Sequence, residues 1–304
     1  MNDLFGGNLI FVYMPFEILK IKNLKIGFDP KLHTSGSLQS YFGKTNYNLI
    51  PIAQNLIDKL WIEKKNTSIK KFYLLPKKAI GEGYQSKIKK LSEILRKKKI
   101  ELQFMTASEN IAWLLNIRGH DSNFSPIPNS YLIIDKNKKG ILFCNSKKIN
   151  NSFKKKFKDI RIMNIENISL FLSKIKRKKV LIDSFTCSVY FQNILKTNNK
   201  IINFLDPIYY LKSIKNKIEI RNTIKSHVYD GAALTKFLIW LKKNYKKQRV
   251  SEITAQEKLL EFRKKNKDFS FLSFPTISGS GPNGAIIHYK ASKKSNRKLK
   301  KGDI

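Results

Sequence analysis

Residues 55–205 alternate between short apolar runs typical of strands and longer segments with apolar residues at helical spacing. "KIELQFMT" predicts a strand, and "SENIAWLLNI" predicts a helix with Ser108 as its N-cap. "NSYLIID" and "GILFCN" predict a hairpin whose turn lies at 136–140, and "KKVLID" predicts a strand that leads into the helix "SFTCSVYFQNIL". This alternation indicates an α/β domain with a mixed sheet.

The residues before this domain contain fewer elements. "LKIKNLKIGFDPKLHT" predicts a strand and a turn at 27–30, followed by a helix that begins at Thr34 or Ser35. A fold of this size would leave its core exposed to water. We therefore expect residues 1–54 to be the remnant of a first domain.

The pattern changes after Asp206 and Pro207. A long amphipathic helix is predicted, and its apolar side is marked by Ile220, Ile224, His227, Ala232, Leu234, Phe237 and Leu238. A second helix follows with Ser251 as its cap, and then two strands joined by a glycine-rich loop. Because Ile304 enters a further strand, we expect residues 206–304 to be the unfinished beginning of a further domain.

Composition narrows the possible classes of protein. The 304 residues carry a formal net charge of +38, but the lysines are spread over nearly all loops and are not interleaved with aromatics, so we predict no nucleic-acid partner. No apolar run approaches the ~20 residues of a membrane span, and the N-terminus lacks the basic region of a signal peptide. Cys144 and Cys187 are far apart, which favours two reduced thiols in a cytoplasmic protein.

The segment "SFPTISGSGPNGAIIHYK" is the strongest candidate for chemistry. Its "GSGPNG" matches a dinucleotide fingerprint, but Pro282 removes an N–H group and the residues that follow are of strand type. We predict a tight loop with positive φ at Asn283 and Gly284, which presents a strand carrying His288. The residues alone leave a functional and a structural role for His288 equally open.

Several segments together resemble the Xaa-Pro aminopeptidases (aminopeptidase P), a family of pita-bread metallopeptidases. The matching segments are "LSFPTISGSGPNGAIIHYKAS", "DPIYYLKSIKNKIEIRNTIKSHVYDGAALTKFLIWL", "SEITAQEKLLEFR" and "TASENIAWLLNIRGHDSNFSPIPNSYLII". "IGFDPKLHT" and "NLIDKLW" are similar to the end of the first domain in the three-domain, cytosolic type.

The resemblance implies a fold and an activity. Residues 55–205 would be a second creatinase N-terminal-like α/β domain, and residues 206–304 the first part of a pita-bread α+β domain. The intact enzyme would use two divalent ions, Mn or Zn, to remove the N-terminal residue from peptides with proline second. His288 would be catalytic and, with Gly281 and Arg118, would bind the substrate. Relatives of this kind are often homodimers.

One departure from the family pattern concerns the metal. The family's ligands, two Asp, one His and two Glu, would lie beyond Ile304, and Asp303 matches a position that is not a ligand. We therefore expect a chain truncated at both ends that binds no metal tightly and is inactive alone. The alternative is a non-catalytic, protein-binding relative or a truncated gene product. For Arg118 the alternative to substrate binding is a local pairing, and we expect His120 to be exposed and His227 to be buried.

Overall fold

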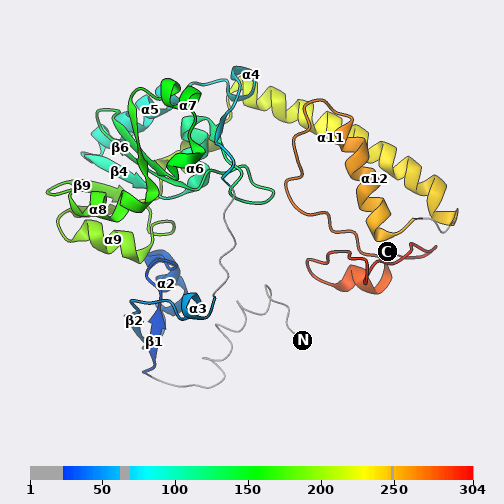
Figure 1. The fold of residues 1–304 in the computed structure, drawn as a ribbon, viewed down its shortest axis with the longest axis horizontal. Helices are drawn as coiled ribbons and strands as arrows, with labels where there is room; N and C mark the ends of the chain where they lie inside the picture. Colours follow the sequence, from blue (N-terminus) through cyan, green and yellow to red (C-terminus); the bar gives the residue numbers. More distant parts are fainter. Residues whose placement is uncertain (1–22, 62–68, 248–249, 304) are drawn as a thin grey trace. The chain divides into compact units, whose positions relative to one another are not determined.

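The computed structural model describes residues 23–61, 69–247 and 250–303, which form two compact units (Figure 1). Unit 1 contains the described residues up to 74 together with 83–119 and 127–214. Unit 2 contains 75–82, 120–126 and the described residues from 215 onward. Each unit is described by itself below.

Unit 1 is built on a six-stranded mixed sheet with the order β10-β9-β4-β6-β7-β8. The strands are β4 (Leu102–Met105), β6 (Ser130–Asp135), β7 (Gly140–Cys144), β8 (Ile160–Asn164), β9 (Lys179–Ile182) and β10 (Lys200–Asn203). β6 pairs antiparallel with both β4 and β7, whereas the β10–β9, β9–β4 and β7–β8 pairs are parallel. The predicted mixed sheet and the hairpin between β6 and β7 are therefore confirmed.

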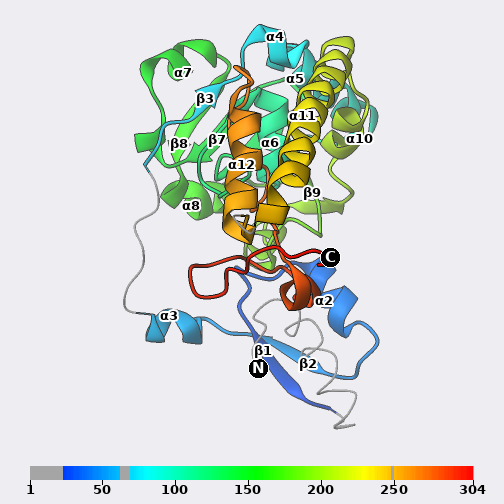
Figure 2. The same ribbon diagram turned by 90° about the vertical axis from the view of Figure 1, so that its right-hand side faces the viewer.

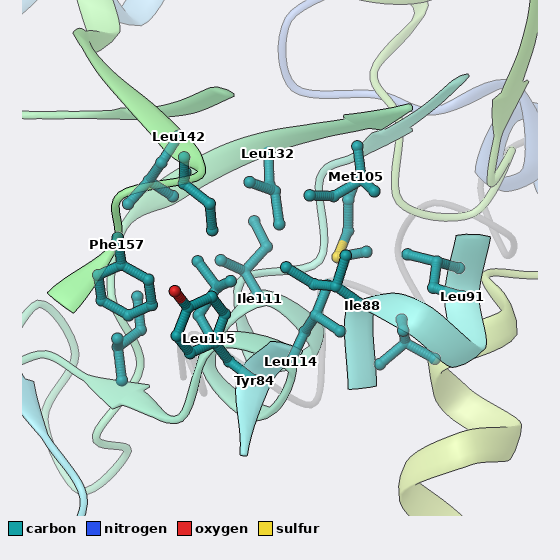
Figure 3. Packing of buried hydrophobic residues seen from close by; sticks show 14 of the residues in the cluster. Tyr84, Ile88, Leu91, Met105, Ile111, Leu114, Leu115, Leu132, Leu142 and Phe157 are labelled. Carbon is teal, nitrogen blue, oxygen red and sulfur yellow. The ribbon is translucent and has the colours of Figure 1, made fainter. Parts of the chain in front are cut away.

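Helices cover both faces of this sheet (Figure 1). They are α5 (Tyr84–Lys97), α6 (Ser108–Leu115) and α7 (Asn151–Lys156) on one face, and α8 (Ile168–Ser173) and α9 (Val189–Lys196) on the other. Neighbouring strand residues alternate between the faces: Leu132 and Ile134 pack in the cluster with α5 and α6, and Ile133 packs with α8 and α9. Figure 3 shows the first cluster, in which Leu132 and Met105 face Ile88, Ile111 and Leu114. Ser108 is the first helical residue of α6, and Ala107, not Ser108, occupies the N-cap position.

The segment before this sheet forms a small separate layer of unit 1. It contains β1 (Lys25–Phe28), α2 (Ser35–Phe42), β2 (Asn48–Pro51) and α3 (Leu56–Leu60), and β1 pairs parallel with β2. Thr34 caps α2 through a capping box with Ser37, as the sequence predicts. The Gly36 N–H donates to the Ser184 carbonyl at 2.8 Å, which ties α2 to the residues before α9.

Short elements complete unit 1. They are β3 (Tyr73–Leu74), β5 (Ile117–Arg118), η1 (Ser146–Lys148), η2 (Ile165–Asn167) and α10 (Pro207–Ser213). Asp206 caps α10 with Pro207 as its first residue, and its carboxylate accepts hydrogen bonds from Gln103 Nε2 and Asn110 Nδ2 at 2.8 and 2.6 Å. A buried carboxylate therefore joins α10 to the sheet and to α6.

Unit 2 is helical in the described residues. It contains α4 (Lys77–Ile80), α11 (Lys217–Asn244), η3 (Tyr245–Lys247), α12 (Glu252–Lys264) and η4 (Gly281–Ala285). Figures 1 and 2 show α11 and α12 side by side, and Arg263 on α12 forms a bidentate ion pair with Asp230 on α11. Ser251 caps α12, as predicted.

The apolar side predicted for α11 is largely exposed in the described part of the chain. Ile220, Ile224, Leu234 and Leu238 are exposed, and Ala233 is the one buried residue of this helix. The expectation that His227 is buried was wrong because its side chain lies on this exposed surface. His120 is exposed, as expected.

The two strands predicted around the glycine-rich loop are not formed. Residues 281–285 are a 3₁₀-helix, residues 286–288 form a bend and a turn, and no strand is found among the described residues of unit 2. A strand requires a neighbouring backbone to receive its hydrogen bonds, and here the N–H groups of Ile286 and Tyr289 donate to the carbonyls of Asn283 and Ile286, each at 3.2 Å. The β-branched residues therefore predicted the wrong local structure.

Among residues 23–61, 69–247 and 250–303, no helix has both the length and the apolar character needed to cross a bilayer.

Candidate active site

The candidate site is organised around Glu252, the first residue of α12. Ser251 accepts a hydrogen bond from Thr254 N and starts the helix, which leaves Glu252 in the first turn. The helix dipole favours a negative charge at this position. Glu252 is fully buried, so its carboxylate must be satisfied by protein donors.

Four donors meet this carboxylate. Oε1 accepts from Ser280 N at 2.8 Å and Asn283 Nδ2 at 2.9 Å, and Oε2 accepts from Tyr289 Oη at 2.8 Å and Arg297 N at 3.0 Å. Burial alone would raise the pKa of Glu252, but these hydrogen bonds outweigh it and hold the pKa below its usual value. The site therefore contains a buried, ionised carboxylate that binds three separate segments of the chain.

The loop that follows Ser280 turns at Gly281, whose φ is +56°. A Cβ at this position would lie 3.2 Å from Arg297 Nη2, so a side chain would meet both backbone strain and a crowded neighbour. The positive φ was predicted for Asn283 and Gly284, but both lie within η4, and Gly281 takes that conformation instead. Because Gly281 and Gly284 themselves lie in this five-residue 3₁₀-helix, the α-helix that a dinucleotide fingerprint requires is absent from these described residues.

His288 lies in the turn after η4, in a left-handed conformation with φ of +56°. Its side chain is exposed, between exposed Ile287 and buried Tyr289. A residue with a Cβ pays a free-energy cost for this conformation, so surrounding contacts must hold it. Tyr289 supplies such contacts, because its hydroxyl bonds Glu252 and also lies 2.9 Å from Asn283 Nδ2.

A second carboxylate lies on the other side of the loop. Asp303 Oδ2 accepts hydrogen bonds from Ser280 Oγ at 2.7 Å and Lys300 N at 2.9 Å, and the bond from Ser280 is the largest cause that lowers the pKa of Asp303. Next to it is a cavity of about 540 Å³, with Leu238, Tyr245 and Leu299 among its apolar lining and Lys242, Lys300 and Lys301 among its cations. Ligand pockets in proteins fall in this range of volumes.

Arg118, the predicted site residue in unit 1, is bound locally. Its Nη1 donates to the carbonyls of Ala112 at 3.0 Å and Ile117 at 2.9 Å. Burial lowers the pKa of this guanidinium. Its role in substrate binding stays a prediction, whereas Gly281 and His288 lie together in unit 2 at the two ends of the segment held by Glu252.

The described residues do not fit a metal centre. No group of three or more His, Cys, Asp or Glu among them could hold an ion. The nearby acidic groups are engaged: Glu252 by its four donors, Asp230 by Arg263, and Asp268 by Lys225. We therefore assign no metal ligand in the part of the chain that the structure describes.

The sequence analysis missed Glu252, Asn283 and Tyr289 as parts of the site. Ser251 was identified as a helix cap, and an acidic residue directly after a cap usually serves only the helix dipole. The available signal was the low number of acidic residues, 22 against 60 basic ones, which makes a glutamate at a helix start notable in this chain.

Comparisons with known proteins match both parts of the chain. The model of the Creatinase/Prolidase N-terminal domain matches residues 63–219, and that of metallopeptidase family M24 matches residues 221–304. An Xaa-Pro aminopeptidase of Drosophila melanogaster is 33% identical over 92% of this chain and 47% of its own length. A probable Xaa-Pro aminopeptidase P of Laccaria bicolor is 32% identical over 92% of this chain and 45% of its own length.

Solved structures of named peptidases also match the chain. An X-prolyl aminopeptidase from Caenorhabditis elegans, described as a cytosolic enzyme with a di-nuclear active site, matches with a TM-score of 0.84 and 25% identity over 95% of this chain and 49% of its own. An Xaa-Pro dipeptidase from Bacillus anthracis shares the fold, with a TM-score of 0.52 and 19% identity over 73% of this chain and 59% of its own. The chain thus spans about half the length of the curated relatives that it matches.

Proposed function

From the premise that the chain belongs to the Xaa-Pro aminopeptidase family, with a creatinase/prolidase N-terminal domain followed by M24 metallopeptidase sequence, we propose that it acts in removing the N-terminal residue from peptides with proline second. The names of the relatives support this substrate class. The proposal concerns the activity named for the relatives, of whose length this chain matches about half.

The observation that carries the proposal is the presentation of His288. An exposed imidazole is presented in a left-handed turn next to Tyr289, which is buried and bound to Glu252, and this anchored presentation supports a role in binding. An imidazole can hydrogen-bond a peptide at the scissile bond and pass a proton to the departing proline nitrogen. Gly281, which has no side chain, leaves its backbone open to an extended peptide.

The relatives imply divalent metal ions, and we assign none to the described residues, which do not fit them. The mechanism given to this chain therefore stops at its own groups: His288 binds the peptide and holds the proton for the proline nitrogen. Metal analysis of the purified protein tests this assignment, and a stoichiometric amount of Mn or Zn would contradict it.

Three finer predictions accompany this function. Arg118 contributes to an edge of the substrate cleft. The protein acts in the cytoplasm, which is supported by the description of the nematode enzyme as cytosolic. It assembles as a homodimer. Sedimentation velocity tests the dimer. If an Arg118→Lys variant binds peptide as well as the unmodified protein, Arg118 does not take part in substrate binding.

The experiment that tests the proposed function is a peptide titration monitored by histidine side-chain NMR. The chain has four histidines, so a His288→Gln variant identifies the His288 signals directly. A tripeptide with proline second should shift these signals saturably, whereas the same peptide with alanine second should not, and exposed His120 should be unaffected. Equal responses to both peptides, or no response at His288, would overturn the proposal.

Chromatography of the same samples, with Mn²⁺ added, separates an enzyme from the alternative. Release of the first residue supports hydrolysis by this chain. Proline-dependent binding without release favours a non-catalytic binding module. If the first residue is released, a catalytic role for His288 requires that His288→Ala lowers kcat by ~10²–10⁴-fold with little change in KM.

A further inference from the structure

We propose that Glu252 is the positioning residue of this site, and that its carboxylate fixes the glycine loop and the His288 turn in a single arrangement. The inference rests on the proposed function, because it takes His288 as the group presented to the peptide. Glu252 itself is fully buried and acts through other residues.

The first support is the pair of backbone groups that the carboxylate binds. The Ser280 N–H lies 28 residues away in sequence and the Arg297 N–H lies 45 residues away, and each donates to a different oxygen. The Glu252 N–H in turn donates to the Arg297 carbonyl at 3.0 Å. One side chain on α12 thus holds both ends of the segment that contains Gly281 and His288.

The second support is the pair of side chains inside that segment. Asn283 reaches the carboxylate from η4, and Tyr289 reaches it from the residue next to His288. Asn283 Nδ2 and Tyr289 Oη are 2.9 Å apart, and Asn283 Nδ2 also lies 3.0 Å from the Ser295 carbonyl oxygen. The loop and the turn are therefore linked to each other as well as to Glu252.

Only a carboxylate satisfies this set of donors. Each oxygen receives one backbone N–H, whose direction cannot be reversed. The amide of a glutamine has one acceptor oxygen and one donor nitrogen, so in either orientation its NH₂ group would face a backbone N–H. Tyr289 could rotate its hydroxyl to adapt, but the Ser280 and Arg297 amides could not.

The charged groups and donors around Glu252 favour the ionised form of its carboxylate. The donors lower the pKa of Glu252, and the Arg297 cation lies next to the same loop. Asp303, the nearest other carboxylate of the network, is separated from Glu252 by Ser280, which donates its N–H to Glu252 and its hydroxyl to Asp303. The loop thus lies between two negative groups that both accept its donors.

The experiment compares Glu252→Gln with Glu257→Gln, an exposed glutamate on the same helix. Hydrogen exchange should become faster by ~10-fold or more at the Ser280 and Arg297 amides in Glu252→Gln, the change expected when hydrogen bonds to a charged group are lost. The His288 signals should shift or broaden, while the amides in the middle of α12, such as Leu259, stay protected. Glu257→Gln should resemble the unmodified protein in each measurement.

Unchanged exchange at Ser280 and Arg297 with unchanged His288 signals in Glu252→Gln would overturn the proposal, as would the same changes in Glu257→Gln. If Glu252→Gln also unprotects Leu259, a second variant decides: Tyr289→Phe keeps the carboxylate and should alter His288 while Ser280 stays protected. A Tyr289→Phe variant with unaltered His288 signals would then refute it. None of these measurements uses peptide, so failure of the proposed function leaves their result intact.

Discussion

The two units are ordered by different forces. Unit 1 has a sheet with buried apolar clusters on both faces, and residues such as Leu132 and Phe143 are completely buried. In the described residues of unit 2 the buried apolar residues are few: Ala233, Val250, Ala255, Tyr289 and Ala291. Its loops are held by the hydrogen bonds of Glu252. Apolar burial stabilises a unit as a whole, whereas a carboxylate fixes particular backbone groups, which suits a unit that presents a reactive side chain.

The largest expected effect is in the core of unit 1. Leu132→Ala should lower the free energy of unfolding of unit 1 by about 2–5 kcal/mol, because it removes buried methyl groups and leaves a cavity. Urea denaturation followed by the near-ultraviolet signal measures this loss. Leu170→Ala, at an exposed position of α8, is the control and should change it by less than about 0.5 kcal/mol. Equal losses would contradict the two-faced core.

The second effect is in the hydrogen-bond network of unit 2. Asn283→Ala should destabilise unit 2 by about 1–3 kcal/mol, because donors to a buried charged group are lost. Hydrogen exchange at the Ser280 amide measures the loss locally. Asn283→Asp keeps the shape but places a second negative charge beside Glu252, so its loss at pH 7 should be larger than that of Asn283→Ala. A smaller loss for the aspartate would show that packing, not charge, dominates.

The third expected effect is a gain in the stability of unit 2, opposite in sign to the first two. His288→Gly should stabilise unit 2 by about 1 kcal/mol, since glycine adopts φ of +56° without the cost that a Cβ brings. His227→Gly is the matched control: it lies within α11, where glycine should destabilise by about 0.5–1 kcal/mol. Thermal unfolding of both variants gives the comparison. Destabilisation by His288→Gly would mean that the imidazole itself supports the fold.

The smallest expected effect is in the pH dependence of stability, whose sign should differ between the two units. Burial and nearby Asp183 raise the pKa of Asp206 in unit 1, whereas hydrogen bonds lower that of Glu252 in unit 2 against the effect of burial. A lowered carboxyl pKa contributes stability that is present above the usual pKa of 4.5 and is lost as the pH falls through the pKa of the folded state. A raised carboxyl pKa contributes stability as the pH falls toward the pKa of the folded state.

Acidification from pH 7 should therefore first stabilise unit 1 through Asp206 and then, below pH 4.5, lower the stability of unit 2 through Glu252. Exchange rates of amides in each unit, corrected for intrinsic pH dependence, measure the two slopes. Glu252→Gln should flatten the slope of unit 2, and Asp206→Asn that of unit 1. Identical slopes in all three proteins would contradict the assignment.

The sequence by itself determined the α/β sheet of unit 1, the hairpin between β6 and β7, and the helix starts at Thr34 and Ser251. These features depend on local patterns: apolar periodicity, turn residues and caps act over a few positions. The residues around His288 likewise indicated the family by themselves, and the match to metallopeptidase family M24 over residues 221–304 agrees with them.

Only the tertiary structure decided how that segment is built. The β-branched residues before His288 predicted a strand, but the chain forms a 3₁₀-helix and a left-handed turn. Glu252, distant in sequence, binds the Ser280 and Arg297 N–H groups and the Asn283 and Tyr289 side chains. Between them, the N–H groups of Ile286 and Tyr289 donate to the carbonyls of Asn283 and Ile286, each at 3.2 Å. A strand exists only where a neighbouring backbone accepts its hydrogen bonds, and here the N–H groups of Ile286 and Tyr289 bond to carbonyls three residues earlier, which closes a turn instead.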